Sequence, residues 1–374
     1  LFVGHWDRPG VLASLTGFFA SSKANIATIR TYRTSKGVRA YTIIETDEVL
    51  PESALDSIRS MDNVVETALV KVPGTSEVAP DAQLHYGFDN GAELLALCEK
   101  ADKTIGEVMA LREAELDNAD LASQQQRMAH VADVMEEETT KPLVEPQLSL
   151  GGFLNGQAKA VANHTARYAP TLLGETLSSA VARAMAVLER SAAMGVIVAA
   201  PTAGSAGVVP GAVLASAKAQ GASQQDLLNA LWNSAAIGAI ISRNATVAGA
   251  EGGCQAEVGA AAAMAASALV ELHDGTPKQA LEAASIAIAN LLGLVCDPVR
   301  GLVEFPCQDR NAIGVSDAFS AAQLALSNVG CPVPFDEAVS VMYSVGKAIP
   351  TTLRETALGG LAQAPSCLAC SGCH

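Results

Sequence analysis

From Asn90 onwards the chain is a succession of apolar segments with helical periodicity, rich in Ala and Gly and poor in charge. Ala260-Ala-Ala-Ala-Met-Ala-Ala-Ser-Ala-Leu is the plainest example. Small side chains let helices approach closely, and a helix that is apolar on every face has to be buried. The sequence therefore predicts a mostly α-helical domain over residues 91–374. The expected helices are Glu93–Leu111, Met128–Glu138, Thr176–Met194, Gln225–Ser242, Glu257–Leu272, Pro277–Leu292, Asp317–Ser327 and Phe335–Ala348.

Composition limits the partners and the compartment. The longest uncharged stretch, residues 191–217, contains Pro201, Pro210 and several glycines, so a membrane bundle is disfavoured. The formal charge of −15 argues against nucleic acid and against anionic membrane surfaces. Eight cysteines, mostly late in the chain, do not resemble a secreted disulfide framework. We expect a soluble protein of the reducing cytoplasm that binds a small molecule.

Over residues 1–72 the sequence pattern differs from that of the helical domain, because short strand-like segments are interspersed with helical ones. This pattern predicts a small α+β domain of the ferredoxin-like kind. Residues 73–90 follow as a linker, with Pro73 and Pro80 as breakers and no apolar period. The chain opens on Leu1 inside what reads as a strand, which suggests a fragment of a longer protein. The expected order of elements is strand, helix, strand, strand, helix, strand over Leu1–Gly4, Val11–Ser21, Ile26–Arg33, Ala40–Glu45, Glu52–Ser60 and Val64–Val70.

The first strand-to-helix connection is Asp7-Arg8-Pro9-Gly10. Proline presets the first helical turn, and glycine permits close approach to the free amides of a helix N-terminus. A ligand carboxylate would fit there. A plain helix-entry turn explains the local pattern equally well.

Three cysteines stand beside glycine or proline: Cys254 in Gly-Gly-Cys, Cys296 in Val-Cys-Asp-Pro, and Cys307 in Phe-Pro-Cys. Glycine admits a bulky ligand close to the backbone, and proline fixes a turn that presents a thiolate outside a helix. Thiolates are the standard ligands of iron–sulfur clusters, and three of them leave one iron open for substrate. This pattern indicates a catalytic metal centre.

Other interpretations of the cysteines stay open. Zinc also accepts three thiolates and a water. The tail Cys367-Leu-Ala-Cys370-Ser-Gly-Cys373-His374 has metal-ligand spacing of its own, so it either binds a separate metal or folds one thiolate back onto the open iron. Cys98 and Cys331 lack such context and are expected to be structural.

Residues 200–211, Ala-Pro-Thr-Ala-Gly-Ser-Ala-Gly-Val-Val-Pro-Gly, form a predicted loop between two apolar helices. Successive amides there can bind an anion, with Thr202 and Ser205 as further donors. The loop lacks the Gly-Lys-Ser/Thr of a Walker loop and the strand of a dinucleotide fingerprint. A tight helix–helix turn is the alternative.

Together these segments resemble the bacterial iron–sulfur-dependent L-serine dehydratases, also called L-serine ammonia-lyases. Residues 1–72 resemble an ACT domain, a regulatory amino-acid-binding module that accompanies that family. The segments similar to the family's α domain are Ala200–Gly211, Gly252-Gly-Cys-Gln-Ala-Glu-Val-Gly, Gly293-Leu-Val-Cys-Asp-Pro-Val, Pro306-Cys with Arg310-Asn311-Ala312, and Leu353-Arg-Glu-Thr-Ala-Leu-Gly-Gly-Leu-Ala.

The resemblance implies a [4Fe–4S] cluster and no pyridoxal phosphate. One iron acts as Lewis acid on the serine hydroxyl, a base takes the α-proton, and the aminoacrylate yields pyruvate and ammonia. The implied metal ligands are Cys254, Cys296 and Cys307, with Cys367 of the tail on the open iron until substrate displaces it. The implied substrate-binding residues are Thr202, Gly204, Ser205, Asn244 and Arg310. The implied regulatory-ligand residues are Asp7, Pro9, Gly10, Asn25 and Ile26.

One departure from the family is the missing β domain, whose Ser-Ser-Ser-His segment helps to build the active site. Ser21-Ser22 and Ser178-Ser179 are not followed by His. We therefore expect a partner β domain or subunit, and a homo-oligomer. The alternative function is a non-catalytic, amino-acid-sensing subunit with a structural metal. Threonine is a further candidate substrate, since one methyl group shifts binding by only about 1–3 kcal/mol.

Overall fold

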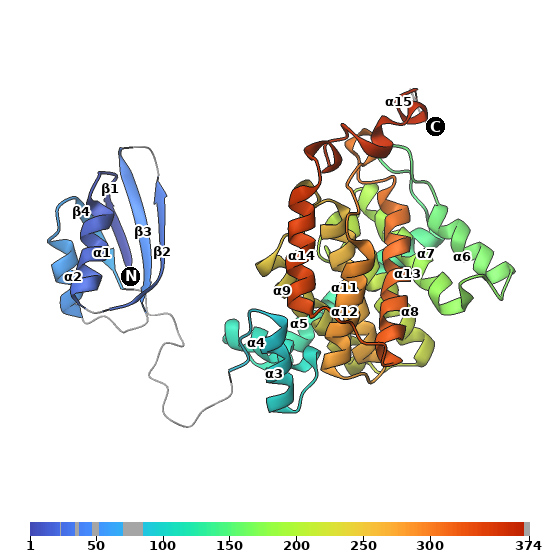
Figure 1. Cartoon of the computed structure of the whole chain (residues 1–374), viewed down its shortest axis with the longest axis horizontal. Coiled ribbons are helices and arrows are strands. Elements are labelled where there is room, and N and C mark those ends of the chain that lie inside the picture. Colours follow the sequence, from blue (N-terminus) through green and yellow to red (C-terminus); the bar gives the residue numbers. More distant parts are fainter. Residues whose placement is uncertain (23, 34–36, 47–51, 70–84, 370–374) are drawn as a thin grey trace. The chain divides into compact units, whose positions relative to one another are not determined.

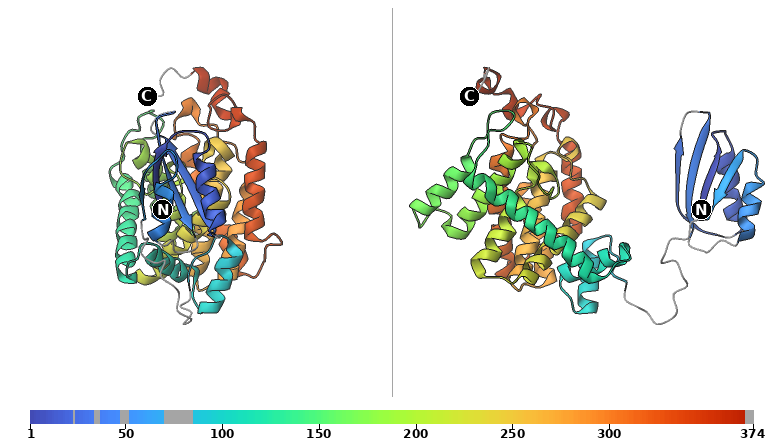
Figure 2. Two further views of the ribbon diagram at one scale, coloured as in Figure 1. Left: turned by 90° about the vertical axis from the view of Figure 1, so that its left-hand side faces the viewer. Right: turned by 180° about the vertical axis from the view of Figure 1, so that it is seen from behind.

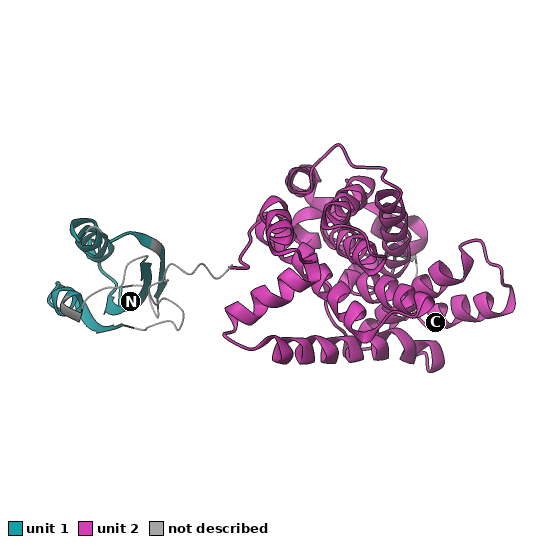
Figure 3. Cartoon of the chain, turned by 90° about the horizontal axis from the view of Figure 1, so that it is seen from below, with its two compact units in different colours: residues 1–83 teal, residues 84–374 magenta. Residues whose placement is uncertain are grey.

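The computed structural model describes residues 1–22, 24–33, 37–46, 52–69 and 85–369. It has two compact units, residues 1–83 and 84–374, shown in different colours in Figure 3. Most of the linker expected over residues 73–90 lies outside the described residues.

Unit 1 is a four-stranded antiparallel sheet with strand order β2-β3-β1-β4. Leu15, Phe19 and Ile58 from the two helices pack with Val3 and Ile44 from the strands, so both helices cover one face of the sheet (Figure 1). The predicted α+β order is confirmed. The elements are β1 (Phe2–Trp6), α1 (Val11–Ser21), β2 (Ile26–Arg33), β3 (Arg39–Thr46), α2 (Glu52–Arg59) and β4 (Val64–Ala68).

Unit 2 is mostly helical, as predicted. Its centre is α11, on which every residue except Glu271 is buried and which packs against α8, α9, α12 and α13. The long α5 crosses the outside of the bundle (Figure 2, right). The helices are α3 (Gly91–Ala101), α4 (Ile105–Leu116), α5 (Leu121–Val144), α6 (Gln157–Arg167), α7 (Gly174–Ala192), α8 (Val208–Gln220), α9 (Gln224–Asn244), α10 (Gly249–Gly252), α11 (Ala260–Leu272), α12 (Pro277–Leu291), α13 (Cys307–Leu326), α14 (Phe335–Ala348) and α15 (Pro365–Ala369).

Small residues allow the close helix packing that the sequence predicts. A Cβ atom built on Gly207 would lie 2.2 Å from the carbonyl oxygen of Ala184, and one on Gly211 would lie 2.8 Å from that of Ala180. Helices α7 and α8 therefore approach more closely than any side chain at these two positions allows.

Several predicted boundaries are wrong. The expected helix Glu93–Leu111 is two helices, because Asp102 adopts a left-handed conformation with φ 52° and Thr104 starts α4 with a capping box to Glu107. Helix α13 begins at Cys307 rather than at Asp317. Helix α6 was not predicted, because its sequence is polar and only Ala158 on it is buried.

Residues 350–363, called the strap below, follow α14 and lead into α15. Strap and α15 lie at the C-terminal end of α14 (Figure 1, red). The strap contains two short 3-10 turns, Thr351–Leu353 and Gly360–Gln363. Across the described residues, no helix is both long and apolar enough to cross a membrane.

Candidate metal centre

The three cysteines of the predicted centre come from three different elements. Cys254 lies between α10 and a π-helical turn, Gln255–Gly259. Cys296 lies in an extended segment that forms an isolated β-bridge with Arg354. Cys307 is the first residue of α13. All three are buried, with exposed fractions of 2%, 2% and 5%.

Cys254 and Cys296 form a close pair. Their sulfur atoms and a carboxylate oxygen of Glu257 all lie within 4.8 Å of one another. The hydrogen bond from Cys296 lowers the pKa of Cys254, and the Arg310 guanidinium, 3.4 Å from the Cys254 sulfur, lowers it further. The same hydrogen bond and burial raise the pKa of Cys296. The pair thus favours a thiolate on Cys254 that accepts a hydrogen bond from the thiol of Cys296.

Cys307 lies close enough to Cys254 for the charge of Cys254 to affect its pKa. Burial raises the pKa of Cys307 to about 12, with a further contribution from the negative charge of Cys254. The expectation that proline would present Cys307 outside a helix is wrong, because the residue begins α13 directly after Pro306. That position still suits a thiolate, since the amides of a helix N-terminus stabilise negative charge.

Glu257 is the residue of this site that the sequence analysis did not single out. It accepts a hydrogen bond from Thr202 Oγ1 at 2.7 Å, and the Cys296 sulfur lies 3.8 Å from its other carboxylate oxygen. Burial raises the pKa of Glu257. The π-helical turn that carries Glu257 is a form often found at functional sites, but it is a feature of the fold that the sequence pattern does not show.

Glycine keeps the space around this carboxylate open. A Cβ atom on Gly249 would lie 2.5 Å from Glu257 Oε2 and 3.2 Å from the Cys296 sulfur. A Cβ atom on Gly204 would lie 3.0 Å from Glu257 Oε1. The contact at Gly249 is closer than real Cβ atoms come, and the contact at Gly204 would require Glu257 to shift slightly. The backbone therefore approaches the carboxylate closely on two sides.

The predicted loop from Ala200 ends at Gly207, because α8 begins at Val208. The side-chain oxygens of Thr202 and Ser205 are hydrogen-bonded to each other at 3.1 Å. Asn311 on α13 fastens the loop, since its amide donates to the Gly204 carbonyl at 2.8 Å and accepts from the Gly207 amide at 3.0 Å. The structure thus brings the loop, Glu257 and the cysteines together.

Arg310 is half-buried by contacts within the chain. Its guanidinium donates to the Val295 carbonyl at 2.8 Å and to Asp297 Oδ1 at 2.6 Å, besides its contact with Cys254. Cys367 lies on α15 beyond the strap and is half-buried. Cys370 and Cys373 lie outside the described residues.

Comparison with known proteins covers nearly all of unit 2. The sequence model described as "Serine dehydratase alpha chain" matches residues 90–362, and the model described as "ACT domain" matches residues 1–63. The chain belongs to the serine dehydratase alpha-chain family. The predicted family and fold class are therefore confirmed.

Two relatives that are named alpha chains and one longer relative illustrate the similarity. The "Probable L-serine dehydratase, alpha chain" of Bacillus subtilis is 43% identical over 279 residues, which cover 75% of this chain and 92% of the relative. The "L-serine dehydratase, alpha chain" of Peptoniphilus asaccharolyticus is 43% identical over 277 residues, or 74% and 94%. "L-serine dehydratase 1" of Escherichia coli is 34% identical over 302 residues, and the match spans only 65% of that longer relative.

The serine dehydratase alpha-chain family is of the iron–sulfur type, and the buried cysteines of this member form a candidate metal site.

Asn244, expected to bind substrate, lies at the end of α9. Its amide nitrogen donates to the carbonyls of Asp89, at 2.7 Å, and of Ile240, at 3.0 Å. These bonds connect α9 to the start of unit 2 and leave a role in substrate binding as a prediction.

The expected ligand loop of the ACT domain is in place in unit 1. Gly10 has φ 93° and begins α1 without a side-chain cap. Asp7 accepts from the Gly37 amide at 2.8 Å and pairs with Arg33 at 3.1 Å. Asn25 and Ile26 stand at the start of β2, and Pro9 precedes Gly10. Ligand binding by this loop stays a prediction.

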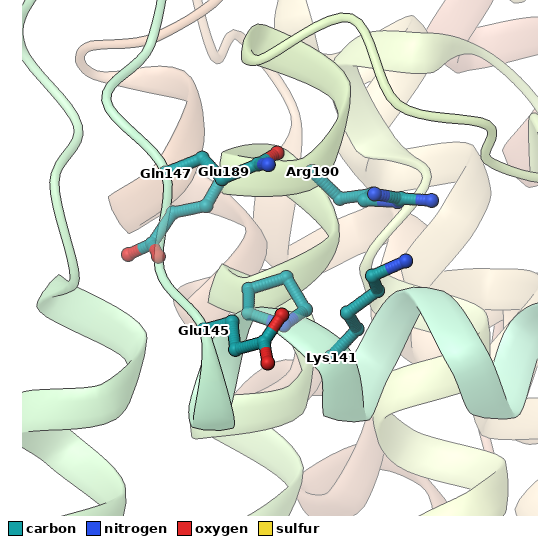
Figure 4. A pocket seen from close by; sticks show the side chains of 6 residues that line it. Lys141, Glu145, Gln147, Glu189 and Arg190 are labelled. Atoms are coloured by element: carbon teal, nitrogen blue, oxygen red, sulfur yellow. The ribbon is translucent and has the colours of Figure 1, made fainter.

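A second buried carboxylate, Glu189 on α7, hydrogen-bonds to the side chain of Gln308, the residue that follows Cys307. Its Oε1 accepts from the Gln308 side chain at 3.0 Å and from the Ala158 amide at 2.8 Å. Its Oε2 is buried without a hydrogen-bond partner among the described residues. Glu189 lines a cavity of about 20 Å³, which is enough for one water. Figure 4 shows the side chains around it. The cavity is lined by Lys141, Pro142, Glu145, Gln147, Glu189 and Arg190.

Proposed function

We propose that the chain is the α chain of an L-serine dehydratase, a lyase that converts L-serine into pyruvate and ammonia. The observation that carries this proposal is that ligand atoms of buried Cys254, Cys296 and Glu257 lie within 4.8 Å of one another. Cys307 and the loop from Ala200 lie next to them, in a unit that matches the serine dehydratase alpha-chain family. The relatives that match most of their own length are named L-serine dehydratase alpha chains.

The donor set fits an iron–sulfur cluster. Cys254 favours the thiolate form, which is the form that binds metal, and Arg310 supplies a compensating positive charge. Soft thiolates select iron–sulfur clusters or zinc over hard oxygen-binding cations. We therefore assign Cys254, Cys296 and Cys307 as ligands of a [4Fe–4S] cluster, with Cys367 as a tail ligand. When bound, the cluster supplies an open iron that polarises the serine hydroxyl.

The chain's own residues position the substrate. Thr202, Gly204 and Ser205 lie on a loop that Asn311 and Glu257 hold at the cysteine site, and the backbone amides of such a loop suit the serine carboxylate. Arg310 contacts Cys254 and Asp297, where its charge also stabilises the thiolate. Asn244 and Arg310 complete the set of proposed substrate-binding residues.

The reaction needs one proton acceptor and one leaving group. The α-proton and the β-hydroxide leave serine together as water, and the resulting enamine tautomerises and takes up water to give pyruvate and ammonia. Since the relatives of matching length are named alpha chains and the longer Escherichia coli relative is matched over only 65%, we propose a β chain as partner.

The test is an anaerobic assay of iron, sulfide and zinc on the purified chain, followed by pyruvate formation from L-serine with and without a β chain. Iron and sulfide in equal amounts, with pyruvate formed in the mixture, are expected. Zinc without iron, or a mixture that holds the cluster and forms no pyruvate, would overturn the proposal. Parallel assays with L-threonine measure the preference between the two hydroxy amino acids.

A further inference from the structure

Asp297 is a buried carboxylate that no step of the proposed reaction uses. Its side chain is 3% exposed. Oδ1 accepts from the Arg310 guanidinium at 2.6 Å, and Oδ2 accepts from the backbone amide of Leu361 at 2.6 Å. The two oxygens of one carboxylate thus bind two different parts of unit 2: the first turn of α13 and the strap.

The backbone of the strap also hydrogen-bonds to Cys296, the residue before Asp297. The Cys296 amide donates to the Leu353 carbonyl at 2.9 Å, and the Glu355 amide donates to the Cys296 carbonyl at 2.7 Å. Arg354 donates to the Glu251 carbonyl at 3.1 Å. The strap therefore follows the edge of the metal centre, and Asp297 is the side chain that fixes its far end.

Gly360 is required for this approach. A Cβ atom on Gly360 would lie 2.2 Å from Asp297 Oδ2, and its φ of 63° is a conformation that other residues rarely adopt. The contact between Leu361 and Asp297 thus depends on a glycine directly before the donor amide. This gives a second, independent position at which the same contact is broken.

We propose that Asp297 is a positioning residue that joins the strap to Arg310 and thereby holds the guanidinium beside the Cys254 sulfur. A buried guanidinium with a charged partner on one side keeps its other donors in fixed directions, here toward Cys254 and the Val295 carbonyl. The inference about the strap rests on contacts within the chain alone. The inference about metal retention rests on the proposed function.

Three variants separate these contacts. Asp297→Asn removes the negative charge that accepts hydrogen bonds from the Arg310 guanidinium and from the Leu361 amide. Gly360→Ala places a Cβ atom against Asp297 Oδ2 and so disrupts the contact with the strap, but it keeps the negative charge that pairs with Arg310. Leu361→Ala is the matched control, because the amide that donates to Asp297 is kept and the side chain is exposed.

The first measurement is hydrogen exchange of the peptide that carries Leu361, in the apoprotein and in the metal-loaded protein. Exchange of the Leu361 amide is expected to rise at least about tenfold in Asp297→Asn and Gly360→Ala, since a hydrogen bond to a charged group is lost. Leu361→Ala is expected to exchange at the wild-type rate. Wild-type exchange in both other variants would overturn the role of Asp297 at the strap, whether or not the chain binds iron.

The second measurement is the rate at which a chelator removes iron from the loaded protein, with the visible absorbance recorded alongside. Faster loss in Asp297→Asn than in Gly360→Ala is expected, because only the former removes the charge that pairs with Arg310. Equal loss in the two variants would show that the strap retains the metal without Arg310 and would overturn that part of the inference. If no variant and no wild-type sample holds iron, the proposed cluster fails while the exchange result still decides the strap.

Discussion

Thr202 donates its hydroxyl to Glu257 Oε1 at 2.7 Å, a contact between residues 55 positions apart. It joins the loop from Ala200 to the π-helical turn that follows Cys254. Because the Cys296 sulfur is 3.8 Å from the same carboxylate, Glu257 links the proposed substrate loop to the metal ligands. In the proposed function, this contact keeps the substrate loop next to the metal ligands.

Replacing Glu257 tests this link. Glu257→Ala is expected to lower kcat/KM for L-serine by roughly tenfold to a hundredfold, because a small misplacement of a substrate loop has effects of that size. Glu257→Gln keeps an oxygen that accepts from Thr202 and is expected to retain most of the activity. Pyruvate formation with the β chain present is the measurement. An equal loss in both variants would mean that the negative charge matters rather than the hydrogen bond.

Replacing Cys296 tests the proposed ligand set. Cys296→Ser is expected to abolish cluster assembly, since a serine hydroxyl is a poor ligand for a soft metal site. Cys331→Ser is the control, because that half-buried cysteine lies beyond the far end of α13 from Cys307. Iron and sulfide per chain after anaerobic reconstitution decide the outcome. Full iron content in Cys296→Ser would remove this residue from the ligand set.

Much of the fold follows from local patterns in the sequence. The apolar helical period found α7, α9, α12 and α14, because their starts and ends coincide with changes in polarity or with caps such as Thr276-Pro277. Asp102 was missed as a helix end, because a left-handed residue there is usually glycine or asparagine. Polar α6 was missed because periodicity shows a helix only where one face is buried.

The site was predictable only in part. Glycine and proline beside Cys254, Cys296 and Cys307 are local signals of a presented thiolate. Glu257 and Asp297 carry no such signal, because their roles come from contacts with Thr202 and Leu361, which are distant in sequence. A buried carboxylate is distinguished from an exposed one by tertiary packing, which no local pattern records.

Replacing Glu189 tests the support behind Cys307. Glu189→Ala removes the acceptor of Gln308 and of the Ala158 amide, so the first turn of α13 is expected to loosen and iron to leave faster in the presence of a chelator. Glu189→Gln keeps an acceptor oxygen and serves as the control. Iron loss at the wild-type rate in Glu189→Ala would show that Cys307 holds its place without this carboxylate.

Glu138 on α5 gives a prediction for the pH dependence of stability. Its side chain is fully buried, one oxygen accepts from the Val198 amide at 2.6 Å, and the other has no partner in the described part of the chain. Burial raises the pKa of Glu138 from 4.5 to about 7. Between these values the folded state binds more protons than the unfolded state, so this group makes the protein less stable as pH rises through that window.

Glu138→Gln removes the ionisation and keeps an oxygen for the Val198 amide. The variant is expected to be more stable than wild type at pH 8, by at most about 3 kcal/mol, and to match it near pH 4.5. The exposed Glu145→Gln is the control that should change stability little at either pH. Urea unfolding of the three proteins at both pH values measures the difference. If Glu138→Gln is less stable than wild type at pH 8, the carboxylate is charged and paired in the folded state, and the raised pKa is wrong.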